Sequence, residues 1–208
     1  MATGPPRDRL REALSRYLET PASRSLASLG VSPGLLTALG FLVTVCAACL
    51  AGMGLLLAAG LVFLAGGAMD LLDGALARAT GRVTTSGALL DSVADRLGEG
   101  ALFVGIGVNT ALAGQGTGEL VAMVVVLLLA LLFSQMVSYI RARAEGLGVP
   151  CRVGLATRTE RVVLLSLGLI LQGAGLDPAL LVTVSAVALL SIYTVVQRFL
   201  HVRRQLKG

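Results

Sequence analysis

Charged residues are scarce in this chain, and tryptophan is absent from it. Asp, Glu, Lys and Arg make up 14% of the 208 residues, whereas soluble globular domains carry roughly 25%. No charged side chain lies between Arg24 and Asp70. A helix that spans a bilayer needs about 20 apolar residues, so this segment is long enough for two spans. A water-soluble globular domain is therefore not expected.

Further uncharged segments extend this pattern through the rest of the chain. They are Gly100–Gly118, Leu120–Ile140, Val162–Leu176 and Pro178–Gln197. With the first two spans, they predict an all-α polytopic membrane protein with six transmembrane helices. The spans are expected near residues 35–53, 55–78, 85–112, 119–145, 157–172 and 178–202. Nothing indicates a second domain or a long linker, so residues 1–208 are expected to form a single membrane domain.

Positive charge is confined to one side of this predicted topology. Lys and Arg occur before residue 25, in segments 78–96 and 141–161, and from Arg198 onward. The alternate connections, near residues 52–54, 113–119 and 173–178, contain neither. The positive-inside rule then predicts a cell (inner) membrane protein with both termini and the basic loops in the cytoplasm. Since topology accounts for the basic residues, a nucleic-acid partner is not expected.

The N-terminal segment 7–20 is too charged to span a membrane. Its apolar side chains recur at helical spacing with charged ones between them: Leu10, Leu14, Tyr17 and Leu18 among Arg9, Arg11, Glu12 and Arg16. This pattern predicts an amphipathic helix that lies in the membrane interface. The alternative is a solvated helix that docks on the rest of the protein.

Four aspartates interrupt the predicted membrane helices. Asp70 and Asp73 lie on the second helix, and Asp91 and Asp95 lie on the third. Spacings of three and four residues place each pair on one helix face. The connection 79–84 is short enough to make the two helices antiparallel neighbours, so the four carboxylates should converge. Charged residues inside membrane helices are costly and usually functional.

Convergent carboxylates repel one another unless they take up protons or bind cations. Neither cysteine nor histidine lies nearby, so the all-oxygen set suits Mg²⁺ or Mn²⁺ rather than zinc. Two such ions would share bridging carboxylates and clamp a diphosphate. The alternative is a structural ion network with Arg78, Arg82 and Arg96. That network would not explain the small residues Gly74, Ala77 and Gly87 beside the aspartates.

The aspartates and the small residues share one spacing pattern. It reads Asp70-x₂-Asp73-Gly74-x₂-Ala77-Arg78-x₈-Gly87-x₃-Asp91-x₃-Asp95. This pattern resembles the signature of the CDP-alcohol phosphatidyltransferase family at each of its fixed positions. The resemblance implies six membrane helices, an interfacial N-terminal helix and usually a homodimer. It also implies an enzyme that moves a phosphatidyl group from CDP-diacylglycerol to an alcohol and releases CMP.

The same resemblance implies roles for individual residues. Two metal ions, Mg²⁺ or Mn²⁺, would be held by Asp70, Asp73, Asp91 and Asp95, and Asp95 also corresponds to the general base. By the same resemblance, further positions inside and outside this pattern correspond to contacts with the CDP-lipid. They are Gly34, Leu35, Leu36, Thr37, Asp73, Gly74, Ala77, Arg78, Thr84 and Gly87.

Arginines at the predicted cytoplasmic ends of three helices bear on the acceptor. Arg141 lies near the end of the fourth span, Arg161 opens the fifth, and Arg198 lies near the end of the sixth. Any one of them alone would fit the positive-inside rule or an anionic lipid. Together beside a metal site they favour an acceptor that carries its own phosphate.

Three short stretches resemble the phosphatidylinositol phosphate synthase branch, whose acceptor is inositol phosphate. They are Ser138–Glu145, Glu160-Arg161 and Val196–Arg198. By this resemblance Ser138, Arg141, Arg161 and Arg198 would hold the acceptor phosphate, although the branch usually has lysine in place of Arg141. A sibling enzyme that uses glycerol 3-phosphate is the nearest alternative. An ion transporter with an aspartate site is less favoured, because its acids would lie near the bilayer midplane.

Overall fold

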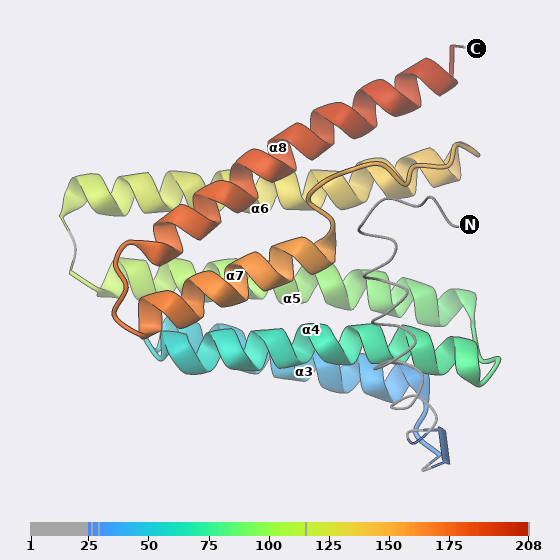
Figure 1. The fold of residues 1–208 in the computed structure, drawn as a ribbon, viewed down its shortest axis with the longest axis horizontal. Helices are drawn as coiled ribbons and strands as arrows, with labels where there is room; N and C mark the ends of the chain where they lie inside the picture. Colours follow the sequence, from blue (N-terminus) through green and yellow to red (C-terminus); the bar gives the residue numbers. More distant parts are fainter. Residues whose placement is uncertain (1–24, 26, 29, 115, 208) are drawn as a thin grey trace, which may run out of the picture. The chain divides into compact units, whose positions relative to one another are not determined.

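The computed structural model describes residues 25, 27, 28, 30–114 and 116–207. Among these residues the chain forms six α-helices and no strand, as the sequence predicted for an all-α protein. Figure 1 shows them in chain order. They are α3 (Pro33–Gly52), α4 (Leu56–Ala79), α5 (Thr85–Leu112), α6 (Thr117–Gly146), α7 (Arg158–Gly173) and α8 (Ala179–Gln205). The predicted interfacial helix at residues 7–20 lies outside the described part of the chain.

Local sequence signals explain where several of these helices begin and end. The Ser32 hydroxyl accepts the Leu35 N–H at 3.2 Å, and Pro33 occupies the first helical position of α3. Serine at the N-cap followed by proline is a favourable helix start. Thr84 caps α5 in the same way and accepts the Gly87 N–H at 3.1 Å. Gly81, with φ +66°, takes the left-handed conformation that the turn before α5 requires.

Four helices, α3, α4, α6 and α8, are long and apolar enough to cross a membrane within the described part of the chain. The other two lie at predicted spans but are less apolar or shorter. Helix α5 carries charged residues in its first half, and α7 has 16 residues. The set of apolar helices fits a multi-pass membrane protein.

The described residues divide into two compact units. The first comprises the residues up to Val43 with Ala65–Leu97, and the second comprises Thr44–Leu64 with the residues from Gly98 onward. All the predicted metal and CDP-lipid residues belong to the first unit, and all the predicted acceptor residues belong to the second.

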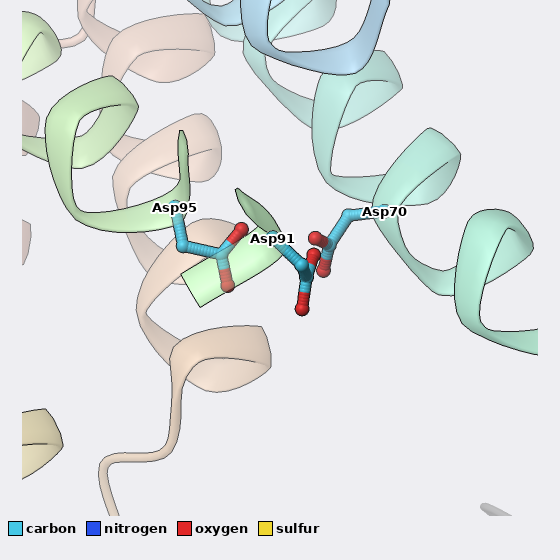
Figure 2. A group of neighbouring side chains, drawn as sticks. All are labelled: Asp70, Asp91 and Asp95. Carbon is cyan, nitrogen blue, oxygen red and sulfur yellow. The ribbon is translucent and has the colours of Figure 1, made fainter. Parts of the chain in front are cut away.

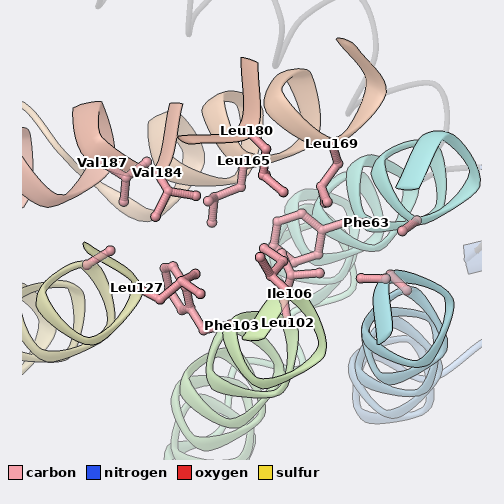
Figure 3. Close-up of a cluster of buried hydrophobic side chains, with 14 of the residues drawn as sticks. Phe63, Leu102, Phe103, Ile106, Leu127, Leu165, Leu169, Leu180, Val184 and Val187 are labelled. Atoms are coloured by element: carbon pink, nitrogen blue, oxygen red, sulfur yellow. The ribbon is translucent and has the colours of Figure 1, made fainter. Parts of the chain in front are cut away.

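The apolar core of the second unit collects side chains from all six helices (Figure 3). Its larger members are Phe63, Leu102, Phe103, Ile106, Leu127, Val162, Leu165, Leu169, Leu180, Val184 and Val187. Helix α8 packs against both α6 and α7. Lipid tails are as apolar as leucine, so van der Waals packing rather than water exclusion stabilises these contacts.

Glycines bring backbones together within this unit. A Cβ at Gly105 would overlap the carbonyl oxygen of Ala48, so α5 and α3 touch through their backbones there. A Cβ at Gly60 would lie 2.8 Å from the Ser166 carbonyl oxygen, where α4 meets α7. Small residues at such crossings are typical of membrane helices.

Candidate functional site

Three of the predicted aspartates come together in the first unit. Asp70 on α4 and Asp91 and Asp95 on α5 each place a carboxylate oxygen within 4.8 Å of the others. Figure 2 shows the carboxylates of Asp70 and Asp91 side by side, with that of Asp95 turned toward them. All three residues are half-buried. The short turn between α4 and α5 and the one-turn spacing on α5 are what make this convergence possible.

Asp73 lies one turn further along α4 and has a different partner. It is buried, and its Oδ2 atom accepts a hydrogen bond from the Thr37 hydroxyl of α3 at 2.7 Å. It is not a member of the group formed by Asp70, Asp91 and Asp95. Thr37 was predicted as a CDP-lipid contact, and its bond to Asp73 was not predicted. No sequence signal indicated which face of α3 would meet α4.

The donor set of the three grouped aspartates fits a hard divalent cation. It consists of carboxylate oxygens from two helices, and the group contains neither histidine nor cysteine. Mg²⁺ and Mn²⁺ prefer such oxygen ligands, whereas zinc prefers nitrogen and sulfur. A bound cation would also relieve the repulsion among carboxylates at this separation. These residues are therefore suited to hold a divalent metal ion.

The predicted CDP-lipid residues differ in how accessible they are. Gly34 and Leu35 at the start of α3, Arg78 at the end of α4, and Thr84 are exposed. Leu36, by contrast, is buried. The exposed residues are accessible to a ligand from solvent or from the membrane. Leu36 is not accessible, so it would support the exposed residues beside it.

The small residues of the motif also have structural contacts. A Cβ at Gly74 would lie 3.3 Å from an Arg78 guanidinium nitrogen, and a Cβ at Gly87 would lie 2.9 Å from the Thr84 hydroxyl. Gly87 therefore leaves room for the cap of α5, and Gly74 leaves room for the Arg78 side chain. Ala77 is half-buried on the same helix as Gly74.

On α6, the predicted acceptor residues lie near the C-terminal end of the helix. Arg141 is exposed and forms an ion pair with Glu145 at 2.9 Å, one turn further on. Ser138 is half-buried. Exposed ion pairs of this kind contribute little to the stability of the fold. Arg141 could therefore leave Glu145 and bind another anion with little loss of stability.

Arg161 and Arg198 are buried in the second unit. Arg161 donates from Nε to Glu99 Oε1 at 2.6 Å, from a terminal nitrogen to Glu99 Oε2 at 2.8 Å, and from the other to the Ala156 carbonyl at 3.0 Å. Arg198 donates to the carbonyls of Val153 at 2.8 Å and Val137 at 2.6 Å. Buried charges are usually paired with an opposite charge, as Arg161 is with Glu99, whereas the acceptors described for Arg198 are backbone carbonyls.

Glu99 is a functional candidate that the sequence did not predict. It is buried, and it lies 62 residues from its partner Arg161. The only available signal was that Glu99 follows Asp95 by four residues at the start of an apolar run. An acid in that position requires a cation, but the sequence does not show which arginine supplies it.

Comparison with known proteins places the chain among lipid-synthesising enzymes. A family model for CDP-alcohol phosphatidyltransferases matches residues 31–199. The archaetidylinositol phosphate synthase of Methanothermobacter thermautotrophicus is 36% identical over 201 residues, which cover 96% of this chain and 95% of that protein. These shared residues extend through both compact units.

Two crystal structures of Mycobacterium tuberculosis phosphatidylinositol phosphate synthase share the fold. The structure with CDP-DAG bound has a TM-score of 0.78 at 35% identity and covers 89% of this chain and 93% of that chain. The structure in complex with manganese and citrate has the same TM-score and identity and covers 89% of this chain and 88% of that chain.

Proposed function

The chain belongs to the CDP-alcohol phosphatidyltransferase family, and on that premise we propose that it transfers a phosphatidyl group from CDP-diacylglycerol to inositol phosphate. It is a CDP-diacylglycerol-dependent phosphatidyltransferase of phospholipid biosynthesis. The observation that carries the proposal is the convergence of Asp70, Asp91 and Asp95 on one site. Phosphoryl transfer depends mainly on positioning and on stabilisation of charge, and this donor set suits both.

The reaction as proposed forms one bond and breaks one bond at phosphorus. The acceptor hydroxyl oxygen bonds to the lipid-side phosphorus, the bond from that phosphorus to CMP breaks, and CMP leaves. An Asp95 carboxylate oxygen takes the hydroxyl proton as the general base. One such proton-transfer group typically contributes about 10²–10⁴-fold to the rate.

The metal ligands in this proposal are Asp70, Asp73, Asp91 and Asp95, with two Mg²⁺ or Mn²⁺ ions per site. Bound there, the cations would neutralise the diphosphate and the charge that develops on CMP. Support comes from the oxygen donors in this chain and from the manganese complex of the M. tuberculosis enzyme. Asp73 would join the ligand set while the Thr37 hydroxyl holds its second oxygen.

The CDP-lipid contacts in this proposal come from the start of α3, the end of α4 and the first turn of α5. They are Gly34, Leu35, Leu36, Thr37, Asp73, Gly74, Ala77, Arg78, Thr84 and Gly87. All of them lie in the same compact unit as the aspartates. The exposed Arg78 would supply positive charge for a diphosphate, and the Thr84 hydroxyl caps the first turn of α5.

Inositol phosphate is the acceptor that the comparisons favour. The archaeal relative is named an archaetidylinositol phosphate synthase, and the M. tuberculosis enzyme is named a phosphatidylinositol phosphate synthase. We assign its phosphate to Ser138, Arg141, Arg161 and Arg198. Buried arginines beside a polar substrate provide charge-assisted hydrogen bonds that discriminate strongly between a phosphorylated and an unphosphorylated acceptor.

The proposed setting is the inner membrane, with both termini and the active site on the cytoplasmic side. Helices α3–α8 would all span the bilayer as one domain, with the segment 7–20 as an interfacial helix, and the chain would form a homodimer. The one-sided distribution of Lys and Arg supports this orientation. The charged half of α5 would extend beyond the hydrocarbon layer at its cytoplasmic end.

An acceptor panel tests the proposal. Purified protein would be incubated with labelled CDP-diacylglycerol and Mg²⁺ or Mn²⁺, and with inositol phosphate, inositol, glycerol 3-phosphate or serine in turn. We expect CMP release and labelled product with inositol phosphate, and loss of both in excess EDTA. Preference for glycerol 3-phosphate would replace the acceptor, and full turnover in EDTA would overturn the metal assignment.

A further inference from the structure

We propose that Glu99 is a positioning residue for the acceptor, acting through Arg161 and the α6–α7 loop; this inference rests on the proposed use of a phosphorylated acceptor. Glu99 is 4% exposed and Arg161 is 1% exposed, so the pair is almost completely buried. Both carboxylate oxygens of Glu99 accept from Arg161, at 2.6 and 2.8 Å. A two-point contact of this kind fixes the plane of the guanidinium group as well as its position.

Arg161 in turn holds the loop between α6 and α7. Its remaining terminal nitrogen donates to the Ala156 carbonyl at 3.0 Å. The hydroxyl oxygen of Thr194 on α8 accepts from the backbone N–H groups of Leu155 at 3.2 Å and Ala156 at 3.0 Å. A buried side chain of α7 therefore donates to the loop backbone, and a buried side chain of α8 accepts from it.

The same loop also holds Arg198. Its Nε donates to the Val153 carbonyl at 2.8 Å, only three residues from Ala156. Gly154 lies between these positions, and a Cβ there would be 3.1 Å from Arg198 Nε. Glu99, Arg161, the loop backbone and Arg198 are thus connected through hydrogen bonds and the chain itself. A change at Glu99 should reach both arginines that we assign to the acceptor phosphate.

The charge balance of this network supports a positioning role. Glu99 offsets the charge of Arg161 and leaves Arg198 as the second buried cation. Four of the five N–H donors of a guanidinium group lie on its terminal nitrogens, so each arginine retains donors beyond the bonds described. Glu99 would therefore hold Arg161 in place without using all of its hydrogen-bonding capacity. Glu99 itself need not touch the acceptor.

A double-mutant cycle tests this role. The variants are Glu99→Gln, Arg161→Ala and the two combined, with Glu119→Gln, an exposed acid of α6, as the matched control. For each variant we would measure the KM for inositol phosphate, the KM for CDP-diacylglycerol and the Tm. Loss of a hydrogen bond to a charged group typically weakens binding by about tenfold or more. We therefore expect Glu99→Gln to raise the acceptor KM about tenfold, with an unchanged KM for the CDP-lipid.

The decisive result is how the two substitutions combine. If Glu99 acts through Arg161, Glu99→Gln should raise the acceptor KM little further once Arg161 is alanine. An equal increase in both backgrounds would overturn the proposal. So would a lower Tm with both KM values unchanged, because that is the result of a purely structural pair. The Glu119→Gln control should match the parent in all three measurements.

Glu99→Asp provides a second variant if loss of the buried charge prevents folding. It keeps the charge but shortens the side chain, so we expect a smaller rise in the acceptor KM and a Tm close to that of the parent. An acceptor KM equal to that of the parent would count against the proposal. If the parent uses a different phosphorylated acceptor, the assignment of inositol phosphate is wrong, and the same cycle with that acceptor still tests Glu99.

Discussion

The Thr37 hydroxyl donates a hydrogen bond to Asp73 Oδ2 at 2.7 Å and so links α3 to α4 beside the grouped aspartates. The Pro33 carbonyl oxygen lies 3.1 Å from the same hydroxyl. A hydroxyl group carries one proton, and the closer, charged acceptor is the stronger partner. The bond therefore fixes the orientation of a carboxylate that we assign to the metal site.

Thr37→Val tests the importance of that orientation. Valine keeps the branched shape but removes the hydroxyl, so Asp73 loses its fixed partner. Loss of a group that orients a metal ligand typically costs about 10- to 100-fold in metal affinity or activity. We expect the Mn²⁺ concentration for half-maximal turnover to rise by at least about tenfold, while Thr37→Ser stays close to the parent. An unchanged Mn²⁺ requirement with a higher KM for CDP-diacylglycerol would assign the hydroxyl to the nucleotide instead.

Asp95→Asn separates proton transfer from substrate binding. The variant keeps the size of the side chain and leaves Asp70, Asp73 and Asp91 as ligands. Turnover should fall by about 10²–10⁴-fold, the usual effect of removing one general base. Binding of CDP-diacylglycerol, measured directly on the same preparation, should largely survive. Near-normal turnover would mean that another group takes the proton.

Much of the helical framework followed from the distribution of charge along the chain. The spans expected from the uncharged segments lie within a few residues of each described helix. The convergence of Asp70 with Asp91 and Asp95 followed from helical spacing and a short turn. These features depend on local sequence, because neighbouring helices joined by a short connection have few ways to pack.

The pairings between distant helices could not be predicted in the same way. Thr37 and Asp73 are 36 residues apart, and Glu99 and Arg161 are 62 residues apart. Each pair depends on how helices rotate and cross, which the membrane leaves undetermined because all apolar faces are equivalent toward lipid. The backbone partners of Arg198 carry no side-chain signal at all. The positions of the charged groups were therefore more predictable from the sequence than their partners.

Arg141→Gln should weaken acceptor binding without affecting the fold. The side chain is exposed and pairs only with Glu145 among the contacts described above, so its loss should leave the Tm unchanged. If it holds the acceptor phosphate, the KM for inositol phosphate should rise by about tenfold or more. Arg143→Gln, at another exposed arginine of the same helix turn, is the matched control. Equal effects of the two substitutions, or equal effects on inositol and inositol phosphate, would defeat this assignment.

Gly105→Ala tests the close crossing of α5 and α3 in the second unit. A Cβ at Gly105 would overlap the Ala48 carbonyl oxygen, a backbone atom that cannot rotate away, so the two helices must separate. At Gly107, two residues further on, the nearest atom would be Leu127 Cδ1 at 4.0 Å, an ordinary contact. Overpacking of this kind typically costs about 1–3 kcal/mol, whereas alanine in a helix is otherwise favoured over glycine by about 1 kcal/mol. Thermal unfolding in detergent should therefore show a lower Tm for Gly105→Ala and an equal or higher Tm for Gly107→Ala. Equal stability of the two variants would mean that this crossing can open at little cost.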